Sequence, residues 1–303
     1  MIDFRPFDLQ NKTQYDQLRL AAGERGCEYS FVNLYLWGRQ SCAFLEGHYV
    51  FFSQFHRRSV YLFPIGQGDI QPALEAVIHD ARKRGIPCRF TGMLEKECAL
   101  LEQLYPGKFH YHHDRDSFDY IYDINDLADL KGKKFQKKRN HLNRFWTTNP
   151  GAELTPITKE NISRCKALVA QWYDLRLEAD PHADFKMEQV AMNRALDNWE
   201  SLGMEGLILS CDGKDVAMTA GSYFGGDTFD IHFEKALDIA DGAYAAINNG
   251  FAKYLREKYP QIQYLNREDD MGLEGLRKAK LSYNPHHLVE KYWACLLEDG
   301  YDY

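Results

Sequence analysis

Residues 207–235, LILSCDGKDVAMTAGSYFGGDTFDIHFEK, decide how this chain folds. Two apolar runs, 207–211 and 216–224, flank Asp212-Gly213, a dipeptide that favours the tight turn of a β-hairpin. A third run, 229–235, alternates polar and apolar residues as a half-buried strand does. The stretch therefore predicts three consecutive antiparallel strands.

The residues after this meander predict two helices and two more strands. A glycine-containing loop leads into a helix at 243–258, which is followed by a strand at 263–266, a helix at 271–281 and a closing strand at 287–295. An antiparallel meander that continues as β-α-β-α-β forms a mixed sheet covered by helices. This order of elements resembles that of the GNAT acyltransferase fold.

The first half of the chain presents the same order of elements. A strand at 4–7 and a helix at 11–22 precede a hairpin around Gly47, and strands and helices then alternate up to a closing strand at 116–122. Matching order with slowly drifting spacing is what a duplication produces. We therefore predict an α/β protein with mixed sheets, built from two tandem GNAT-like acyltransferase domains.

The expected domain limits follow from this repeat. The N-terminal GNAT-like domain is placed at 1–130, a basic connecting helix at 131–149, and the C-terminal GNAT-like domain, which is expected to carry the site, at 150–303.

The composition excludes several classes of protein. There is no run of 18 consecutive apolar residues, so the sequence predicts no membrane span, and the N-terminus shows no signal-peptide pattern. The seven cysteines are scattered without a C-x-x-C pair, which argues against a disulfide framework or a metal site. We expect a cytoplasmic protein that holds no metal.

The connecting segment 131–149 is strongly basic. It holds seven Lys and Arg residues and no Asp or Glu, in a chain whose net charge is −7. Wound as a helix, it places Phe135, Leu142 and Trp146 on one stripe. The opposite face then carries the cations and one histidine: Lys133, Lys134, Lys137, His141 and Arg144.

This basic face is either the solvated side of a linker helix or a phosphate-binding surface. A solvated linker helix mixes charges of both signs along its surface, and the absence of acids therefore favours a phosphate-binding face. Lys134, Lys137 and Arg144 are the expected anion-binding residues. Arg139 falls inside the apolar stripe, where a cation needs a partner, and we include it in the anion-binding set.

The third strand of the meander carries titratable side chains. Alternation places Asp230, His232 and Glu234 on the same face. Glu234 or His232 is the expected proton acceptor. The alternative is that these residues form the exposed face of a half-buried strand.

A second group of polar residues follows the strand that ends at Asn266. Ligands bind beyond the carboxyl ends of parallel strands in open α/β sheets, which places Asn266 and Glu268 at a candidate site. On the next helix Arg277 and Lys280 lie beside the stripe marked by Leu273 and Leu276, where they are expected to stabilise an anion while Glu268 orients them. Tyr283, just past that helix, is a candidate donor. A structural network of ion pairs is the competing explanation.

The loop at 238–246 lacks the coenzyme A signature of GNAT enzymes. That signature is [Q/R]-x-x-G-x-[G/A]; aligned on Gly242, this chain carries Ile239 and Tyr244 at the Gln/Arg and Gly/Ala positions. Tyr244 would crowd a pyrophosphate that needs close backbone approach. We therefore expect no productive use of acetyl-CoA and no bound cofactor.

Several segments together resemble one bacterial family. They are KKFQKKRNH at 133–141, HFEKA at 232–236, NREDDMG at 266–272 and GLRKAKLSYNP at 275–285. These segments are similar to the stand-alone bacterial proteins related to the C-terminal domain of phosphatidylglycerol lysyltransferases. The resemblance implies a tandem GNAT fold related to the Fem peptidoglycan aminoacyl ligases, which take amino acids from aminoacyl-tRNA.

Three functions remain open from the sequence. The first is aminoacyl transfer from aminoacyl-tRNA to an amine or hydroxyl, which explains the acid-free basic helix and the missing coenzyme A loop together. The second is an acyl-CoA-dependent N-acyltransferase with a degenerate loop, and the third is a non-catalytic binding module. The expected partners are tRNA and an acceptor that is a small molecule, a peptide or a lipid headgroup.

Overall fold

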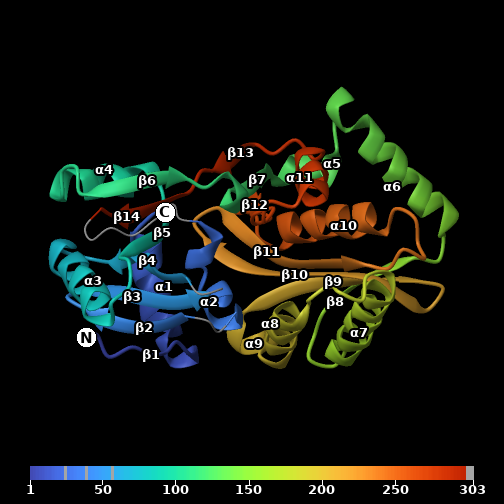
Figure 1. Ribbon diagram of the computed structural model, residues 1–303. Coiled ribbons are helices and arrows are strands. Elements are labelled where there is room, and N and C mark those ends of the chain that lie inside the picture. Colours follow the sequence, from blue (N-terminus) through green and yellow to red (C-terminus); the bar gives the residue numbers. More distant parts are fainter. Residues whose placement is uncertain (24–25, 38–39, 56–57, 298–303) are drawn as a thin grey trace. The chain divides into compact units, whose positions relative to one another are not determined.

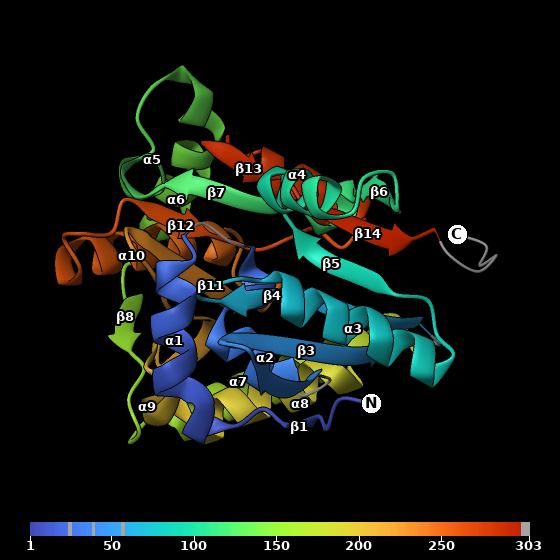
Figure 2. The same ribbon diagram turned by 90° about the vertical axis from the view of Figure 1, so that its left-hand side faces the viewer.

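The computed structural model describes residues 1–23, 26–37, 40–55 and 58–297 (Figure 1, Figure 2). The chain divides into two units. Unit 1 comprises Met1–Asp119, Asp269–Leu273 and the described part of Leu288–Tyr303. Unit 2 comprises Tyr120–Glu268 and Glu274–His287. Each unit is built on one seven-stranded mixed sheet.

The sheet of unit 1 contains one parallel pair. Its order is β1 (Arg5–Pro6), β2 (Gln40–Leu45), β3 (His48–Phe55), β4 (Arg58–Gly66), β5 (Arg89–Met93), β14 (Tyr292–Leu296) and β6 (Phe109–His113). β4 and β5 are parallel and are connected through α3 (Gln71–Arg84), whereas the other neighbours are antiparallel. The remaining helices are α1 (Lys12–Ala21), α2 (Phe31–Trp37) and α4 (Glu95–Leu104).

The sheet of unit 2 repeats this arrangement. Its order is β8 (Glu153–Pro156), β9 (Met204–Cys211), β10 (Lys214–Gly225), β11 (Thr228–Ala236), β12 (Tyr264–Asn266), β7 (Asp119–Asp123) and β13 (His287–Val289). β11 and β12 form the parallel pair, and α10 (Ala243–Lys258) connects them.

Helices cover both faces of the unit 2 sheet. α10 lies on one face together with α5 (Ile124–Asp129), and α7 (Ile162–Ala179) lies on the other face (Figure 1). α8 (Lys186–Asp197) packs against α7, and α9 (Trp199–Leu202) against β9. The basic helix α6 (Gln136–Thr148) packs against α10, and α11 (Glu274–Leu281) follows β12. Helices therefore cover the side chains of β11 on both faces of the sheet.

The two sheets have the same strand order, but each takes its sixth strand from the other half of the sequence. β14, from the C-terminus, fills that position in unit 1, and β7, from the first half, fills it in unit 2. The closing strand expected at 116–122 therefore lies in the sheet of unit 2 and not in that of unit 1. The one expected at 287–295 is divided: β13 lies in the sheet of unit 2, as predicted, whereas β14 lies in that of unit 1. The local pattern of a strand shows that it is a strand but not which distant edge it pairs with, and this is why the sequence missed the exchange.

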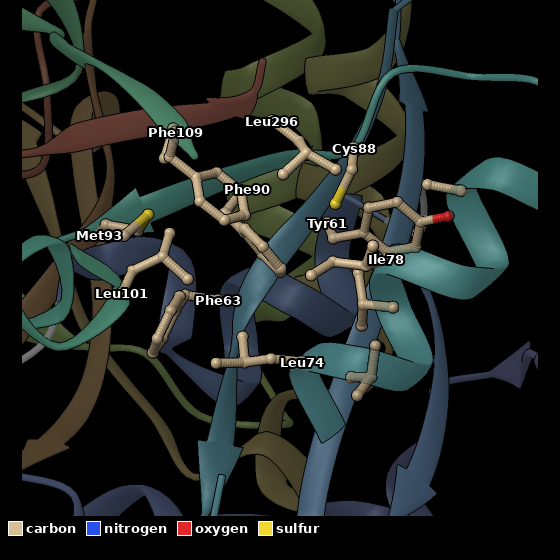
Figure 3. Packing of buried hydrophobic residues seen from close by; sticks show 14 of the residues in the cluster. Tyr61, Phe63, Leu74, Ile78, Cys88, Phe90, Met93, Leu101, Phe109 and Leu296 are labelled. Atoms are coloured by element: carbon tan, nitrogen blue, oxygen red, sulfur yellow. The ribbon is translucent and has the colours of Figure 1, made fainter. Parts of the chain in front are cut away.

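The core of unit 1 shows why these segments fold together. Apolar side chains from β4, α3, β5 and α4 interdigitate around Phe90, which is fully buried (Figure 3). Tyr61 and Phe63 alternate along β4 toward this core, and Leu74 meets them from α3 (Figure 3). Burying each such side chain contributes roughly 1.5–3 kcal/mol.

One charged side chain lies inside this core. Asp80 on α3 is fully buried and accepts hydrogen bonds from Tyr61 Oη (2.8 Å), Arg84 Nε (2.6 Å) and the Ile2 amide (2.7 Å). Burial alone would raise the pKa of Asp80, but these donors lower it below its ordinary value. The carboxylate ties the N-terminal residues to α3.

None of the helices in the described part of the chain combines the length and the apolar character that crossing a bilayer requires.

Candidate functional site

A cavity of about 560 Å³ lies in unit 2 beside the basic helix α6. Its walls come from α6 and the turn before it, from the segment that leads into α10, from the first turn of α10, and from Ser282 and Tyr283, which follow α11. Cationic side chains and one histidine of α6 and its preceding turn line one side: Lys134, Lys137, Lys138 and His141. Tyr244 and Tyr283 add aromatic surface. A cavity of this size accommodates a ligand of nucleotide size.

Gly242 allows α6 and α10 to meet at this cavity. It precedes the first residue of α10 with φ +89°, in the left-handed region that favours glycine. A Cβ atom there would lie 3.1 Å from Phe145 Cβ and 3.3 Å from the His141 carbonyl oxygen. Gly242 is therefore needed both for the left-handed backbone turn before α10 and for the close packing of α6 against it.

Lys138 and Tyr283 meet in the lining of the cavity. The Lys138 Nζ lies 3.8 Å from the centroid of the Tyr283 ring. Burial lowers the pKa of Lys138, and the nearby Arg267 guanidinium lowers it further. Burial also raises the pKa of Tyr283 to about 12, which keeps its hydroxyl protonated at neutral pH.

A buried ion pair lies next to Tyr283. Arg267 Nη2 donates to Glu234 Oε1 over 2.8 Å, and the Arg267 guanidinium also contacts the Tyr283 ring at 5.2 Å. The other Glu234 oxygen accepts from Asn248 Nδ2 at 3.2 Å. Both charged side chains are only 13–14% exposed. The Glu234 charge is therefore compensated inside the unit.

Two buried polar atoms beside Glu234 have unused hydrogen-bonding capacity. Among the described residues, neither Arg267 Nη1 nor Asn248 Oδ1 has a hydrogen-bond partner. Buried donors and acceptors are nearly always paired, with protein, water or ligand. A donor and an acceptor that flank one carboxylate are suited to hold a polar reacting group.

His232 does not share the Glu234 environment. Its side chain is 1% exposed, and its ring nitrogens lie 2.8 Å from Ser222 Oγ and 2.9 Å from Glu268 Oε1. A β-bulge at this residue interrupts the register between β10 and β11. Gly221 permits the bulge, since a Cβ there would lie 2.2 Å from the Asp230 carbonyl oxygen.

This placement separates the two candidates for proton acceptor. His232 is held by Ser222 and Glu268, whereas Glu234 is paired with Arg267, whose guanidinium contacts the Tyr283 ring in the cavity wall. Glu268 Oε1 lies 2.9 Å from His232 Nδ1, so this carboxylate holds the His232 ring. Donor atoms of Asp230, His232 and Glu268 lie within 4.8 Å of one another, so this group has the chemistry of a metal site, although the structure shows the His232 and Glu268 atoms hydrogen-bonded together.

The parallel neighbours β11 and β12 confirm the predicted adjacency of these two strands. Asp230 pairs in register with Asn266, which is 1% exposed and accepts the Glu268 amide through its side chain at 2.7 Å. Asn266 therefore shapes the loop that carries Arg267 and Glu268.

Of the two cations of α11, Lys280 is buried against the loop that follows β12. It is 8% exposed, and its Nζ donates to the carbonyl oxygens of Arg267 (2.5 Å) and Glu268 (3.1 Å), so it holds this loop in place. Arg277 is half-buried. Leu273, expected in the buried stripe, is 55% exposed, because α11 begins only at Glu274.

The connecting segment is helical, as predicted, but part of its charge is neutralised. Arg139 donates to the carbonyl oxygens of Leu130 and Gly132, so it satisfies the end of α5 and is not directed at an anion. Asp126 pairs with Lys134 at 2.6 Å.

Another acid from outside the segment, Asp241, pairs with Arg144. Exposed ion pairs of this kind contribute at most about 1 kcal/mol, so a stronger anionic ligand can displace them. Lys137 lies at the cavity wall and forms no ion pair with any described residue.

Sequence reasoning missed Arg267, Lys138 and Asn248. Arg267 directly follows Asn266 at the end of a parallel strand, which was a usable signal. Lys138 was visible in the basic segment, but its contact with Tyr283 depends on how α6 packs. Asn248 lies inside α10 and carried no signal.

This architecture, two GNAT-like sheets in tandem, is that of acyltransferase-type proteins. A tandem GNAT protein from the clavulanic acid biosynthesis pathway shares it, with a TM-score of 0.51 and 10% identity over 99% of both chains. The structure of FemX matches with a TM-score of 0.62 and 10% identity over 98% of both chains. At these identities the likeness concerns the fold alone.

The chain belongs to the family described as "Phosphatidylglycerol lysyltransferase, C-terminal", whose model matches residues 20–295. A conserved protein of unknown function from Bacteroides thetaiotaomicron VPI-5482 is 41% identical, with a TM-score of 0.91 over 98% of this chain and 100% of that one. L-PGS from Bacillus licheniformis is 15% identical, with a TM-score of 0.70 over 99% of this chain and 95% of that one.

A curated relative, the uncharacterized protein MYCGA3080 of Mycoplasmoides gallisepticum (strain R(low / passage 15 / clone 2)), is 25% identical over 177 residues. The match covers 58% of this chain and 55% of the relative. This chain therefore spans about half the length of the curated relative that it matches.

Proposed function

We propose that this chain is a cytoplasmic aminoacyltransferase that takes its acyl group from aminoacyl-tRNA, uses no bound cofactor, and transfers the group to an amine or hydroxyl. The observation that carries the proposal is that a wall residue of the cationic cavity of unit 2, Tyr283, contacts Arg267 of the buried Glu234–Arg267 pair. Lys138 and Tyr283 line the cavity and also neighbour that pair. The family and its fold support an acyltransferase type of chemistry.

The cavity has the features that bind a single-stranded RNA end. Lysines at the wall neutralise phosphates, and aromatic rings accept a base by stacking, worth about 1–3 kcal/mol per base. Lys134, Lys137 and Tyr244 line the cavity, and Tyr244 is 39% exposed. A terminal nucleotide held there would direct its 3′-ester toward Glu234.

The transfer step uses the groups around Glu234. The acceptor nitrogen or oxygen attacks the ester carbonyl carbon, its new bond to that carbon forms, and the bond from carbon to the 3′-oxygen breaks. Glu234 takes the acceptor's proton and returns it to the leaving 3′-oxygen. Arg267 Nη1, which has no partner among the described residues, donates to the developing oxyanion.

The missing coenzyme A signature supports an RNA donor over acetyl-CoA. Tyr244 and Ile239 stand at positions where that signature needs small or polar residues, and both side chains are exposed at the loop. We propose that acetyl-CoA shows no saturable binding to the purified protein by calorimetry. Micromolar binding that coenzyme A displaces would instead favour the acyl-CoA-dependent function.

The direct test has two stages. The protein is purified from its own cells, and co-purifying RNA and acyl groups are identified by mass spectrometry. The aminoacyl-tRNA found is then labelled on its amino acid and offered with candidate acceptors: small amines, peptides and lipid headgroups. Label that leaves the tRNA only when protein and an acceptor are present supports the proposal, whereas binding without transfer points to a non-catalytic module.

A further inference from the structure

Unit 1 holds a second cavity, of about 220 Å³, that the proposed function does not use. One wall is apolar and includes Phe51, Val60 and Leu62 of the sheet. The opposite side is polar and comes from separate segments of the chain: Cys27, Glu28, Gln40, Asp269 and Lys291. A cavity of this volume accommodates a small molecule with a short aliphatic chain.

A buried lysine forms the polar end of this cavity. Lys291 is 3% exposed, and its Nζ donates to Glu28 Oε2 and to Asp119 Oδ1, both at 2.6 Å. Burial alone would lower the pKa of Lys291, but the Asp119 and Glu28 carboxylates outweigh burial and hold it well above its ordinary value. Lys291 is therefore a fixed charge that is already saturated by two carboxylates.

Glu28 is the carboxylate at this end that the cavity can use. It lines the cavity beside Lys291, which is the one cation among the described residues that line it. Burial raises the pKa of Glu28 above its ordinary value despite the opposing effect of Lys291, and the Asp119 charge adds to the increase. A cation bound beside Glu28 would favour its charged form.

A buried polar atom without a partner lies in the same wall. Gln40 Oε1 is buried and has no hydrogen-bond partner among the described residues. An amide oxygen accepts hydrogen bonds, so its partner must be a donor. Gln40 Oε1 and the buried Glu28 carboxylate both suit a cationic hydrogen-bond donor.

Metal ions and anions are poorer candidates. Donor atoms of Cys27, Glu28 and Asp119 lie within 4.8 Å of one another, as in a metal site. However, Lys291 Nζ already lies against these three groups, 3.6 Å from Cys27 Sγ, and supplies the cation there. An anion would meet the carboxylates, and no unpaired cation in this wall would receive it.

We propose that this cavity binds a small aliphatic primary amine in its ammonium form. The ammonium group would donate to the Glu28 carboxylate and to Gln40 Oε1, while the alkyl chain would lie against Val60 and Leu62. The proposal goes beyond the proposed aminoacyl transfer and does not depend on it, because it concerns a different cavity in a different unit.

The test compares three probes of equal length: n-pentylamine, pentan-1-ol and pentanoate. Binding to the full chain is measured by calorimetry, with methyl NMR signals of Val60 and Leu62 as the local readout. We expect saturable one-to-one binding of pentylamine at least tenfold tighter than pentanol, with shifts of both methyl groups and no binding of pentanoate. Equal binding of amine and alcohol, tighter binding of pentanoate, or zinc binding that excludes the amine would overturn the proposal.

Two variants and one control locate the site. Glu28→Gln is expected to weaken pentylamine binding at least tenfold. Val60→Phe, which fills the apolar part, is expected to abolish it, and this variant carries the test if Glu28→Gln does not fold. Glu75→Gln changes the net charge equally at an exposed position on α3, and binding should be unaffected. Unchanged binding in Val60→Phe, or equal losses in Glu28→Gln and Glu75→Gln, would show that the amine binds elsewhere.

Discussion

Arg267 and Glu234 form a buried ion pair in which only one end of the guanidinium is used. Nη2 donates to Glu234 Oε1 over 2.8 Å, whereas Nη1 has no hydrogen-bond partner among the described residues. Opposite charge keeps the Arg267 pKa above its ordinary value although burial acts in the other direction. The pair therefore presents a fixed positive donor next to a carboxylate that can receive a proton.

Glu234→Gln tests the role of this carboxylate. The amide keeps an acceptor for Arg267 but cannot take a proton, so we expect transfer from aminoacyl-tRNA to fall by at least a hundredfold. Weakening a charged hydrogen bond should also lower the free energy of unfolding by about 1–3 kcal/mol. Transfer is followed with labelled aminoacyl-tRNA, and stability by urea denaturation.

Glu205→Gln is the matched control for stability. Glu205 is another partly buried carboxylate of unit 2; it accepts from Lys258 Nζ (2.7 Å), Tyr254 Oη (2.9 Å) and Tyr259 Oη (2.5 Å). This variant should lose comparable stability and keep its transfer activity. If Glu234→Gln also keeps full transfer while it melts lower, the Glu234–Arg267 pair is only structural.

The salt dependence of tRNA binding tests the basic helix. Lys133→Ser and Lys137→Ser should each reduce the slope of log K against log salt concentration by about 0.7 if each lysine meets one phosphate of a single strand. Asp126→Asn should tighten binding, since it releases Lys134 from its 2.6 Å ion pair. Lys159→Ser, at an exposed position after β8, serves as the control. Identical slopes in all variants would leave α6 as a solvated helix.

Gly242→Ala tests whether α6 must approach α10 closely. A side chain at φ +89° is strained, and its Cβ would lie 3.1 Å from Phe145 Cβ. We expect the free energy of unfolding to fall by about 1–3 kcal/mol. Gly275→Ala in α11, where a Cβ meets nothing within 4 Å, should be neutral or stabilising by up to about 1 kcal/mol. Similar effects of both changes in thermal unfolding would refute the packing role of Gly242.

Asp129 provides a test of pH dependence. Hydrogen bonds from Arg256 and Lys131, both at 2.9 Å, lower the pKa of Asp129 to about 2. A depressed carboxyl pKa adds stability above the unfolded value of about 3.9, and that stability is lost as the pH falls toward 2. Asp129→Asn should lower the free energy of unfolding by at most about 1 kcal/mol at neutral pH, because solvent screens these ion pairs. This difference between parent and variant should disappear as the pH falls from about 5 to about 2. A gap that stays constant over this range would argue against the ion pairs.

The sequence by itself determined the order of the elements and much of their neighbourhood. Asp212-Gly213 indicated the β9–β10 hairpin. The helical spacing of Phe135 and Leu142 indicated α6. The right-handed β-α-β rule placed β11 beside β12. These features are local, or follow from short right-handed connections, and so they are encoded within a few dozen residues. The same reasoning also placed Glu234 close to the strand that ends at Asn266.

The tertiary structure alone decided which distant groups meet. The exchange of β7 and β14 satisfies the same hydrogen bonds as the pairing that we predicted, so no local pattern distinguishes the two. Buried charges are compensated by whichever partner the packing brings near: Arg267 for Glu234, and backbone carbonyls for Lys280. The Lys291 cluster in unit 1 joins residues that lie 172 and 263 positions apart. Periodicity shows which face of an element is buried, but the identity of the opposing face depends on the whole fold.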